Sequence, residues 1–152
     1  MTLLGNTSLL ELPKHGFLCS RTTSSSAILP CLDWAVAMAK GSEPIMSTFH
    51  SQLEQSVLEL LASGTCPIIM LLGRKQYHKL PTHQQTLLDQ DRLLIVSLTD
   101  QPRIDHYSAN LCHHYIATHS ATLTFGYISP NSQLADLFQS FKTSAKLLAH
   151  PI

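Results

Sequence analysis

The sequence predicts an α/β fold in which a mostly parallel sheet is flanked by helices on both sides, giving three layers. Three runs have the composition of buried strands: GFLC at residues 16–19, CPIIMLL at 66–72 and RLLIVS at 92–97. Strands that are buried on both faces of a parallel sheet typically have such continuous apolar sequences. Helical stretches alternate with these runs, and this alternation indicates right-handed crossovers between parallel strands.

The composition fits one globular domain. The chain has 152 residues, and 44% of them are hydrophobic, which excludes a disordered protein. No internal repeat or linker divides it, so we expect a single domain over residues 1–152. The charged fraction of 13% is low and indicates a surface partly covered by a partner or a second copy. The net charge of zero argues against a strong sequence-independent nucleic-acid binder but allows a local basic patch.

The cysteines and histidines do not have the spacing of a disulfide frame or a metal site. Four scattered cysteines without a CxxC pair, Cys19, Cys31, Cys66 and Cys112, are expected to be buried in a reducing compartment. The histidines of residues 106–119 lack an HExxH pattern, so we expect no metal and no cofactor. No signal peptide or membrane-length apolar run is visible, which predicts a cytoplasmic protein without membrane contact.

The first forty residues are expected to contain two strands, a helical turn and a helix. The predicted order is an edge strand at 1–4, a helical turn at 8–12, a buried strand at 16–19, a polar loop at 20–26 and a helix at 28–40. Pro13 stops the helical turn, Pro30 is tolerated in the first turn of the helix, and Gly41 ends that helix.

The stretch at 43–64 organises the predicted fold. Residues 44–46 form a short buried strand, 47–50 a polar turn, and a helix follows. Ser51 and Glu54 have the spacing of a capping box, and Gly64 is expected to end the helix as its C′ residue. A strand that leads into a helix N-terminus directs backbone amides at the turn, so this turn is the predicted anion site.

The second half of the chain continues the alternation. We expect a strand at 66–72, a basic loop at 73–80, a helix at 82–90, a strand at 92–97, a loop at 100–103, a helix at 104–119, a strand at 121–127, a helix capped by Asn131 and a strand at 146–148. The helix at 104–119 carries its apolar period on Ile104, Tyr107, Leu111, Cys112, Tyr115 and Ile116.

Several short motifs, in order, resemble the DNA-processing protein A (DprA/Smf) family over nearly the whole chain. They are GN at 5–6, LL at 9–10, PK at 13–14, Gly16, SR at 20–21, STFHSQLEQSVLELLASGTCPIIMLLGR at 47–74, and the segment 92–127. The resemblance implies a short, single-domain Rossmann-like member. It also implies binding of single-stranded DNA and its transfer to a RecA-type recombinase during transformation.

The sequence departs from the family pattern at several positions. Thr48 stands where the family has a glycine, and Ala109 replaces the arginine that precedes Asn110. The turn after the late strand is Ser-Pro-Asn-Ser at 129–132 instead of a glycine-rich turn. The sequence ends at Ile152, and we expect no winged-helix extension.

Ligands of parallel sheets bind beyond the carboxyl ends of the strands, so the turns after Cys19, Thr48, Leu72 and Ser97 form the candidate rim. The residues predicted to bind phosphate or nucleic acid there are Ser20, Arg21, Ser47, Phe49, His50, Ser51, Arg74 and Asn110. Arg21 can hold a phosphate in its planar fork or make a structural ion pair. His50 and Phe49 can contact a base or serve the loop and the core, and the basic loop around Arg74 and Tyr77 fits a single-strand groove or a solvated surface.

The sequence therefore predicts a non-catalytic protein that binds single-stranded DNA or a nucleotide phosphate. A RecA-type recombinase and a second copy of the chain are the other expected partners. One alternative is an enzyme of the phosphoribohydrolase (lysine-decarboxylase-like) type, whose PGGxGT motif is missing here. The other is a dimeric interaction module that has lost its ligand. Glu54 could act as an acid or base, although capping explains it without chemistry.

Overall fold

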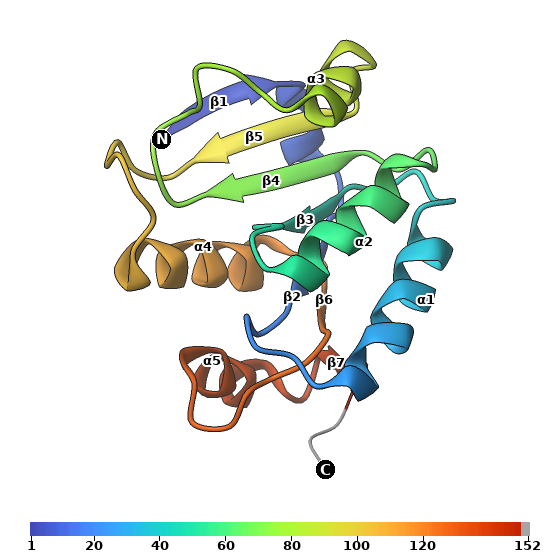
Figure 1. The fold of residues 1–152 in the computed structure, drawn as a ribbon, viewed down its shortest axis with the longest axis vertical. Helices are drawn as coiled ribbons and strands as arrows, with labels where there is room; N and C mark the ends of the chain where they lie inside the picture. Colours follow the sequence, from blue (N-terminus) through green and yellow to red (C-terminus); the bar gives the residue numbers. More distant parts are fainter. Residues whose placement is uncertain (150–152) are drawn as a thin grey trace.

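A computed structural model describes residues 1–149 as an α/β fold built on one sheet (Figure 1). The strands are β1 (Thr2–Gly5), β2 (His15–Leu18), β3 (Ile45–Ser47), β4 (Ile68–Leu72), β5 (Leu93–Ser97), β6 (Thr122–Phe125) and β7 (Lys146–Leu147). The helices are α1 (Ile28–Met38), α2 (Gln52–Ala62), α3 (Thr82–Asp89), α4 (His106–His119) and α5 (Gln133–Phe141), with short 3₁₀ turns at Thr7–Glu11 and Ser25–Ala27. The predicted domain runs to residue 152, and its last three residues lie outside the described part.

The sheet has the predicted parallel core and an antiparallel edge. Its order is β1-β5-β4-β3-β2-β6-β7, and every neighbouring pair is parallel except β1 and β5. The chain moves outwards from β2 to β5 and then returns to add β6 on the other side of β2. The loops after β2 and β6 lead to helices on opposite faces of the sheet. The strand order therefore switches between β2 and β6, and α/β proteins bind ligands at the carboxyl ends of the strands beside such a switch.

Two apolar cores cover the two faces of the sheet, as the continuous apolar strands require. Along β2, Phe17 packs into the core shared with α1, α2 and α3, whereas Leu18 packs into the core shared with α4 and α5. Ile68 and Ile69 alternate between the same two cores on β4. All four cysteines are buried and free, which confirms the prediction that they are core residues.

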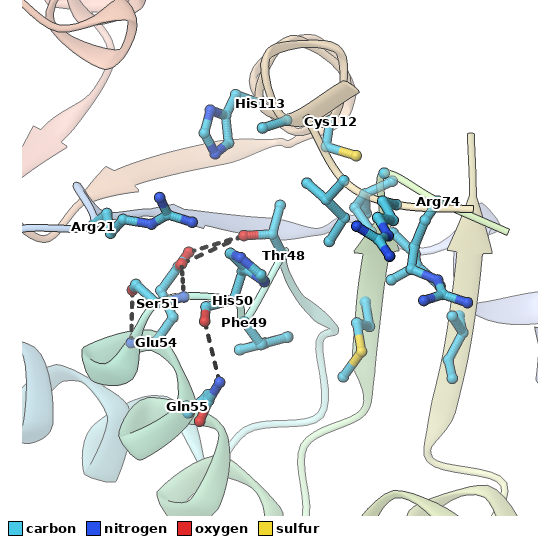
Figure 2. Close-up of a pocket in the computed structure, with 18 of the residues that line it drawn as sticks. Arg21, Thr48, Phe49, His50, Ser51, Glu54, Gln55, Arg74, Cys112 and His113 are labelled. Atoms are coloured by element: carbon cyan, nitrogen blue, oxygen red, sulfur yellow. Dashed lines mark hydrogen bonds between the residues drawn. The ribbon is translucent and has the colours of Figure 1, made fainter. Parts of the chain in front are cut away.

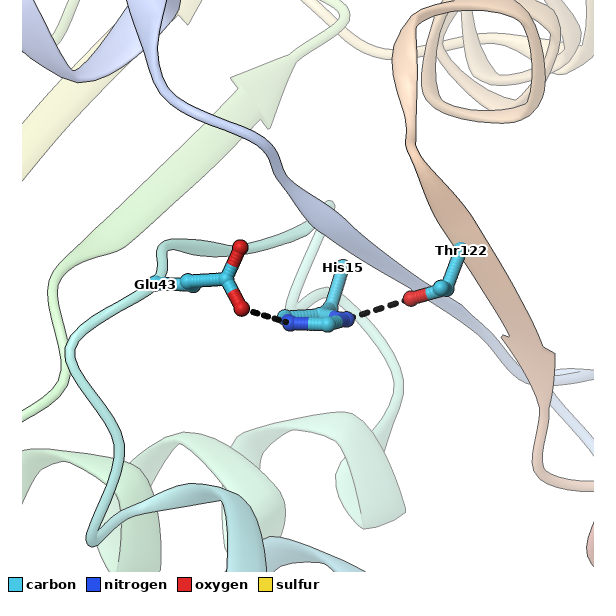
Figure 3. Close-up of polar contacts among 3 residues, drawn as sticks. All are labelled: His15, Glu43 and Thr122. Atoms are coloured by element: carbon cyan, nitrogen blue, oxygen red, sulfur yellow. Dashed lines mark hydrogen bonds and ion pairs between the residues drawn. The ribbon is translucent and has the colours of Figure 1, made fainter.

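The amino ends of the central strands are joined by a polar cluster (Figure 3). The imidazole of His15 contacts the carboxylate of Glu43 at 3.3 Å and the hydroxyl of Thr122. In the register, His15 lies opposite Ile45 of β3 and Thr122 of β6. The cluster therefore ties β2 to the segments on both of its sides, at the end of the sheet opposite the carboxyl rim.

Element boundaries agree with the predicted ones to within two residues, but one predicted helix cap is wrong. Ser132 caps α5, because its hydroxyl accepts from the Ala135 amide at 3.1 Å, whereas Asn131 precedes it with a φ of 57°. Gly64 directly follows the C-cap Ser63 and so ends α2 at the predicted C′ position, although its backbone is not left-handed. A side chain at Gly64 would bring its Cβ within 2.3 Å of the Ala39 carbonyl oxygen, so close approach to α1 is what requires glycine there.

The buried face of α4 also differs from the predicted one. The helix buries Ser108, Cys112 and Ile116 at four-residue spacing. Tyr107 and Leu111, predicted to face inwards, are 74% and 38% exposed. The helix therefore presents apolar side chains to solvent, and its inward face begins one residue later than expected. No helix among residues 1–149 is long and apolar enough to cross a bilayer.

Candidate functional site

A pocket of about 880 Å³ lies beyond the carboxyl ends of the central strands (Figure 2). The loops after four strands contribute to it, with Arg21 after β2, His50 after β3, Arg74 after β4 and Arg103 after β5. Helix α4 closes the other side with His113. The pocket thus occupies the rim at which the sequence predicts a ligand.

The turn between β3 and α2 is fixed by a capping box. The Ser51 hydroxyl accepts from the Glu54 amide at 3.2 Å, and the Glu54 carboxylate accepts from the Ser51 amide at 3.0 Å. The same carboxylate, 2% exposed, also accepts from the hydroxyls of Ser47 at 3.0 Å and Thr48 at 3.3 Å. Burial raises the pKa of Glu54, and these hydrogen bonds oppose that shift.

This capping box changes how the turn can hold an anion. Two of its amides, those of Ser51 and Glu54, are already bonded inside the box. The negative charge of a ligand must therefore be stabilised mainly by the cationic side chains around the pocket, and less by backbone amides of the turn than the sequence predicts. Figure 2 shows Arg21 extending over the capping box towards the pocket.

Phe49 has a strained backbone at the centre of this turn. Its φ of 49° is in the left-handed region, which disfavours a bulky side chain. Its ring is buried in the core at 5% exposure, and its amide donates to the Ser47 hydroxyl at 3.3 Å. This conformation keeps Phe49 in the core while the neighbouring His50 is exposed and lines the pocket.

The pocket brings together five of the eight predicted residues: Arg21, Phe49, His50, Ser51 and Arg74. The other three lie outside its lining. Ser20 is buried and accepts from the Ser129 amide at 2.8 Å, Ser47 is bonded to Glu54, and Asn110 is half-buried on α4. Ser20 and Ser47 thus shape the loops that carry the lining residues.

Positive charge gathers around this pocket although the chain has no net charge. Four of the ten lysines and arginines line it: Arg21, Arg74, Lys79 and Arg103. Two carboxylates, those of Glu54 and Asp105, also line it, and each caps a helix. The Asp105 side chain accepts from the Ser108 amide at 2.8 Å, and that bond is the main reason why its pKa is lowered. Both carboxylates have structural roles as caps, and the four cationic side chains outnumber them around the pocket.

The loop after β4 is held in place by four contacts. The Arg74 guanidinium lies 3.9 Å from the centre of the Tyr77 ring, and its Nε donates to the Lys75 carbonyl at 2.9 Å. The Ser97 hydroxyl donates to the Arg74 carbonyl, and the Lys75 amide donates to the Gln101 carbonyl at 2.9 Å. Arg74 is therefore fixed in both backbone and side chain at the pocket edge.

Four basic residues of the lining were not among the predicted binding residues: Lys79, Arg103, His106 and His113. Burial, followed by the nearby His114 and His50, lowers the pKa of His113 to about 4. His113 is half-buried and lies next to the buried Cys112 on α4. An apolar period placed one residue later along the helix would therefore have indicated it as a pocket residue. Among residues 1–149, no group of three or more histidine, cysteine, aspartate or glutamate side chains could hold a metal ion.

Solved structures with this fold include two of DNA processing protein A. DNA processing protein A from Helicobacter pylori aligns with a TM-score of 0.76 and 18% identity, over 99% of this chain and 72% of that one. DNA processing protein A from Streptococcus pneumoniae aligns with a TM-score of 0.63 and 16% identity, over 95% of this chain and 61% of that one. The chain therefore has the Rossmann-like fold of DNA processing protein A. No model of a known protein family and no curated protein matches the sequence.

Proposed function

We propose that the protein binds single-stranded DNA, or the phosphate of a nucleotide, in the pocket at the carboxyl ends of the strands, without catalysing a reaction on it. The observation that carries this proposal is the position of Arg21, Arg74, Lys79 and Arg103 around one pocket in a chain of zero net charge. The Helicobacter pylori protein with the same fold, described as binding single-stranded DNA, supports it.

The basic residues fit phosphate recognition. Arg21 and Arg74 present planar guanidinium groups that can each bind a phosphate through two parallel hydrogen bonds. His50 lies between them in the chain, at the N-terminus of α2, and can add a donor. The zero net charge makes a large electrostatic footprint implausible, so we expect a small number of phosphate contacts at one place.

The floor of the pocket suits a base more than a second phosphate. It is formed by apolar side chains from the strands and the loop before α4, among them Met70, Leu72, Ile95 and Ile104. A basic rim above an apolar floor matches the two halves of a nucleotide, because phosphates need charge and bases need apolar or stacking contacts.

The phosphoribohydrolase alternative receives no support from the lining carboxylates. That chemistry needs a carboxylate able to act on the substrate. The Glu54 carboxylate is bonded to the Ser51 amide and to two hydroxyls, and the Asp105 carboxylate caps α4. A binding function uses the same residues without removing them from these structural roles.

Direct titration tests the proposal. A fluorescently labelled oligo-dT is titrated with protein at low salt, and anisotropy reports binding. We expect saturable binding that falls by at least about tenfold in the double variant Arg21→Ala, Arg74→Ala, since each charged contact contributes on the order of 1 kcal/mol. The matched control is Lys40→Ala, which removes an exposed cation outside the pocket lining. Equal loss in the control, or no binding by the folded wild-type protein, would contradict the proposal.

Partners of the protein form a second part of the proposal. Exposed apolar side chains lie on both sides of the sheet, Tyr107 and Leu111 on α4 and Leu29 and Val36 on α1, and they support surfaces covered by another chain. We propose a homodimer and a RecA-type recombinase as occupants of such surfaces. Light scattering after size-exclusion chromatography measures the mass of the protein alone, and a pull-down with a purified recombinase tests the second partner. A monomeric mass at all concentrations would exclude the homodimer.

A further inference from the structure

A second, shallower hollow adjoins the main pocket. It has a volume of about 520 Å³ and lies between the loop after β4 and helix α3, where Gln85 and Thr86 contribute to its wall. Tyr77 and Lys79 line both this hollow and the main pocket. The two hollows are therefore neighbours that share one aromatic and one cationic side chain.

Tyr77 stands at the boundary between the two hollows. The Arg74 guanidinium lies against its ring at 3.9 Å from the ring centre, yet the residue remains 45% exposed. An exposed aromatic ring backed by a cation is suited to stack on a base, and every base offers a π-face for such stacking. Tyr77 is thus the one large aromatic side chain shared by the two hollows.

The segment that carries Tyr77 is anchored to the sheet. The Gln76 side-chain amide donates to the Thr2 carbonyl at 3.3 Å and to the Ile95 carbonyl at 3.2 Å. These bonds tie the loop to β1 and β5 immediately before Tyr77. A stacking residue held in this way loses little conformational entropy when a ligand binds, which favours affinity.

The charges around the shared boundary favour an anionic chain. Arg74 lies on the main-pocket side, Lys79 lines both hollows, and His78 lines the second. Asp89 is the carboxylate that lines the second hollow among the described residues. A site for a polynucleotide needs cationic groups for the phosphates and stacking groups for the bases, in alternation along the strand. Tyr77 lies between Arg74 and Lys79 in the sequence and gives this alternation.

We infer that Tyr77 is a stacking platform which carries a single strand out of the main pocket onto α3, so that the site takes an oligonucleotide of several residues and not a mononucleotide alone. The inference rests on the proposed function, because the main pocket must hold one nucleotide for the strand to continue. It adds a second subsite, lined by Tyr77, Lys79, Gln85 and Thr86, to the first.

The test compares two ligands and three proteins. Thymidine monophosphate occupies the main pocket alone, whereas an oligo-dT of about ten residues is long enough to reach the second hollow. Affinities of both are measured by calorimetry for the wild type, Tyr77→Ala and Tyr77→Phe. We expect Tyr77→Ala to weaken oligonucleotide binding by about tenfold, since stacking contributes that order of affinity per base. The variant should weaken mononucleotide binding by clearly less, because in the main pocket it removes only the ring that supports Arg74. Tyr77→Phe keeps the ring and should bind both ligands as the wild type does.

A backbone amide NMR titration supplies an independent measurement. Amides of Gln85 and Thr86 on α3 should shift with the oligonucleotide and remain unmoved by the mononucleotide. Equal weakening of both ligands in Tyr77→Ala, or unmoved α3 amides with the oligonucleotide bound, would overturn the second subsite while leaving the main pocket in place. Failure of the wild type to bind either ligand would instead overturn the proposed function and this inference together.

Discussion

Replacing His113 by glutamine should flatten the acid dependence of stability. In the native state, burial lowers the pKa of His113 to about 4, against an ordinary value of 6.5. Between these two values the unfolded chain binds the proton and the native protein does not, so acidification favours unfolding. The contribution of the neutral imidazole is fully present above the ordinary pKa and is lost as the pH falls towards the native pKa.

The magnitude follows from the two pKa values. The difference between the native and unfolded pKa of His113 lowers the free energy of unfolding by about 2 kcal/mol at pH 5 and about 3 kcal/mol at pH 4, relative to high pH. Urea unfolding at pH 7 and pH 5 measures it as the change in the free energy of unfolding. The wild type should lose about 2 kcal/mol more than His113→Gln over this interval. His83→Gln, which changes an exposed histidine of α3, is the matched control and should follow the wild type. The same acid loss in His113→Gln and in the wild type would refute the account of His113 as a half-buried neutral base beside the pocket.

Two further predictions concern helix ends. Arg92 donates to the carbonyls of Leu61 at 3.2 Å and Ala62 at 3.1 Å at the C-terminus of α2, and to that of Cys66 at 3.0 Å. Arg92→Met keeps the apolar stem and should lower the free energy of unfolding by about 2–3 kcal/mol, because the three carbonyls lose a charged donor. Chemical denaturation measures this change. A loss below about 0.5 kcal/mol would contradict the capping role of Arg92. Ser132→Ala should destabilise by about 1 kcal/mol in the same assay, and Asn131→Gly, at a φ of 57°, should cost less or stabilise. The reverse order of the last two would mean that Asn131 is the cap.

The alternation of strands and helices was predictable because burial on both faces leaves a local signal. The apolar runs of β4 and β5 are fully buried along their length, and no polar position interrupts them. The capping box of α2 was also predictable, since Ser51 and Glu54 satisfy each other within four residues. Signals of this kind depend on short stretches of chain and survive without knowledge of the tertiary structure.

Features that depend on distant partners were not predictable. The Ser20 hydroxyl bonds to the amide of Ser129, far along the sequence, so it appears as a loop residue before the fold is known. The face of α4 is set by packing against the sheet and not by the apolar period alone, which is why His113 lines the pocket and Asn110 does not. Asn131 is a residue type that often caps helices, but its backbone is left-handed and the cap is the next residue, Ser132.

Dependence on salt tests most directly the claim that a basic rim holds an anionic strand. The measurement is the affinity for oligo-dT across a range of sodium chloride concentrations. If Arg21, Arg74, Lys79 and Arg103 all contact phosphates, the plot of log affinity against log salt should have a slope of about −3, since each contact to a single strand contributes about −0.7. A slope near zero, or no affinity at the lowest salt for a correctly folded protein, would contradict the account.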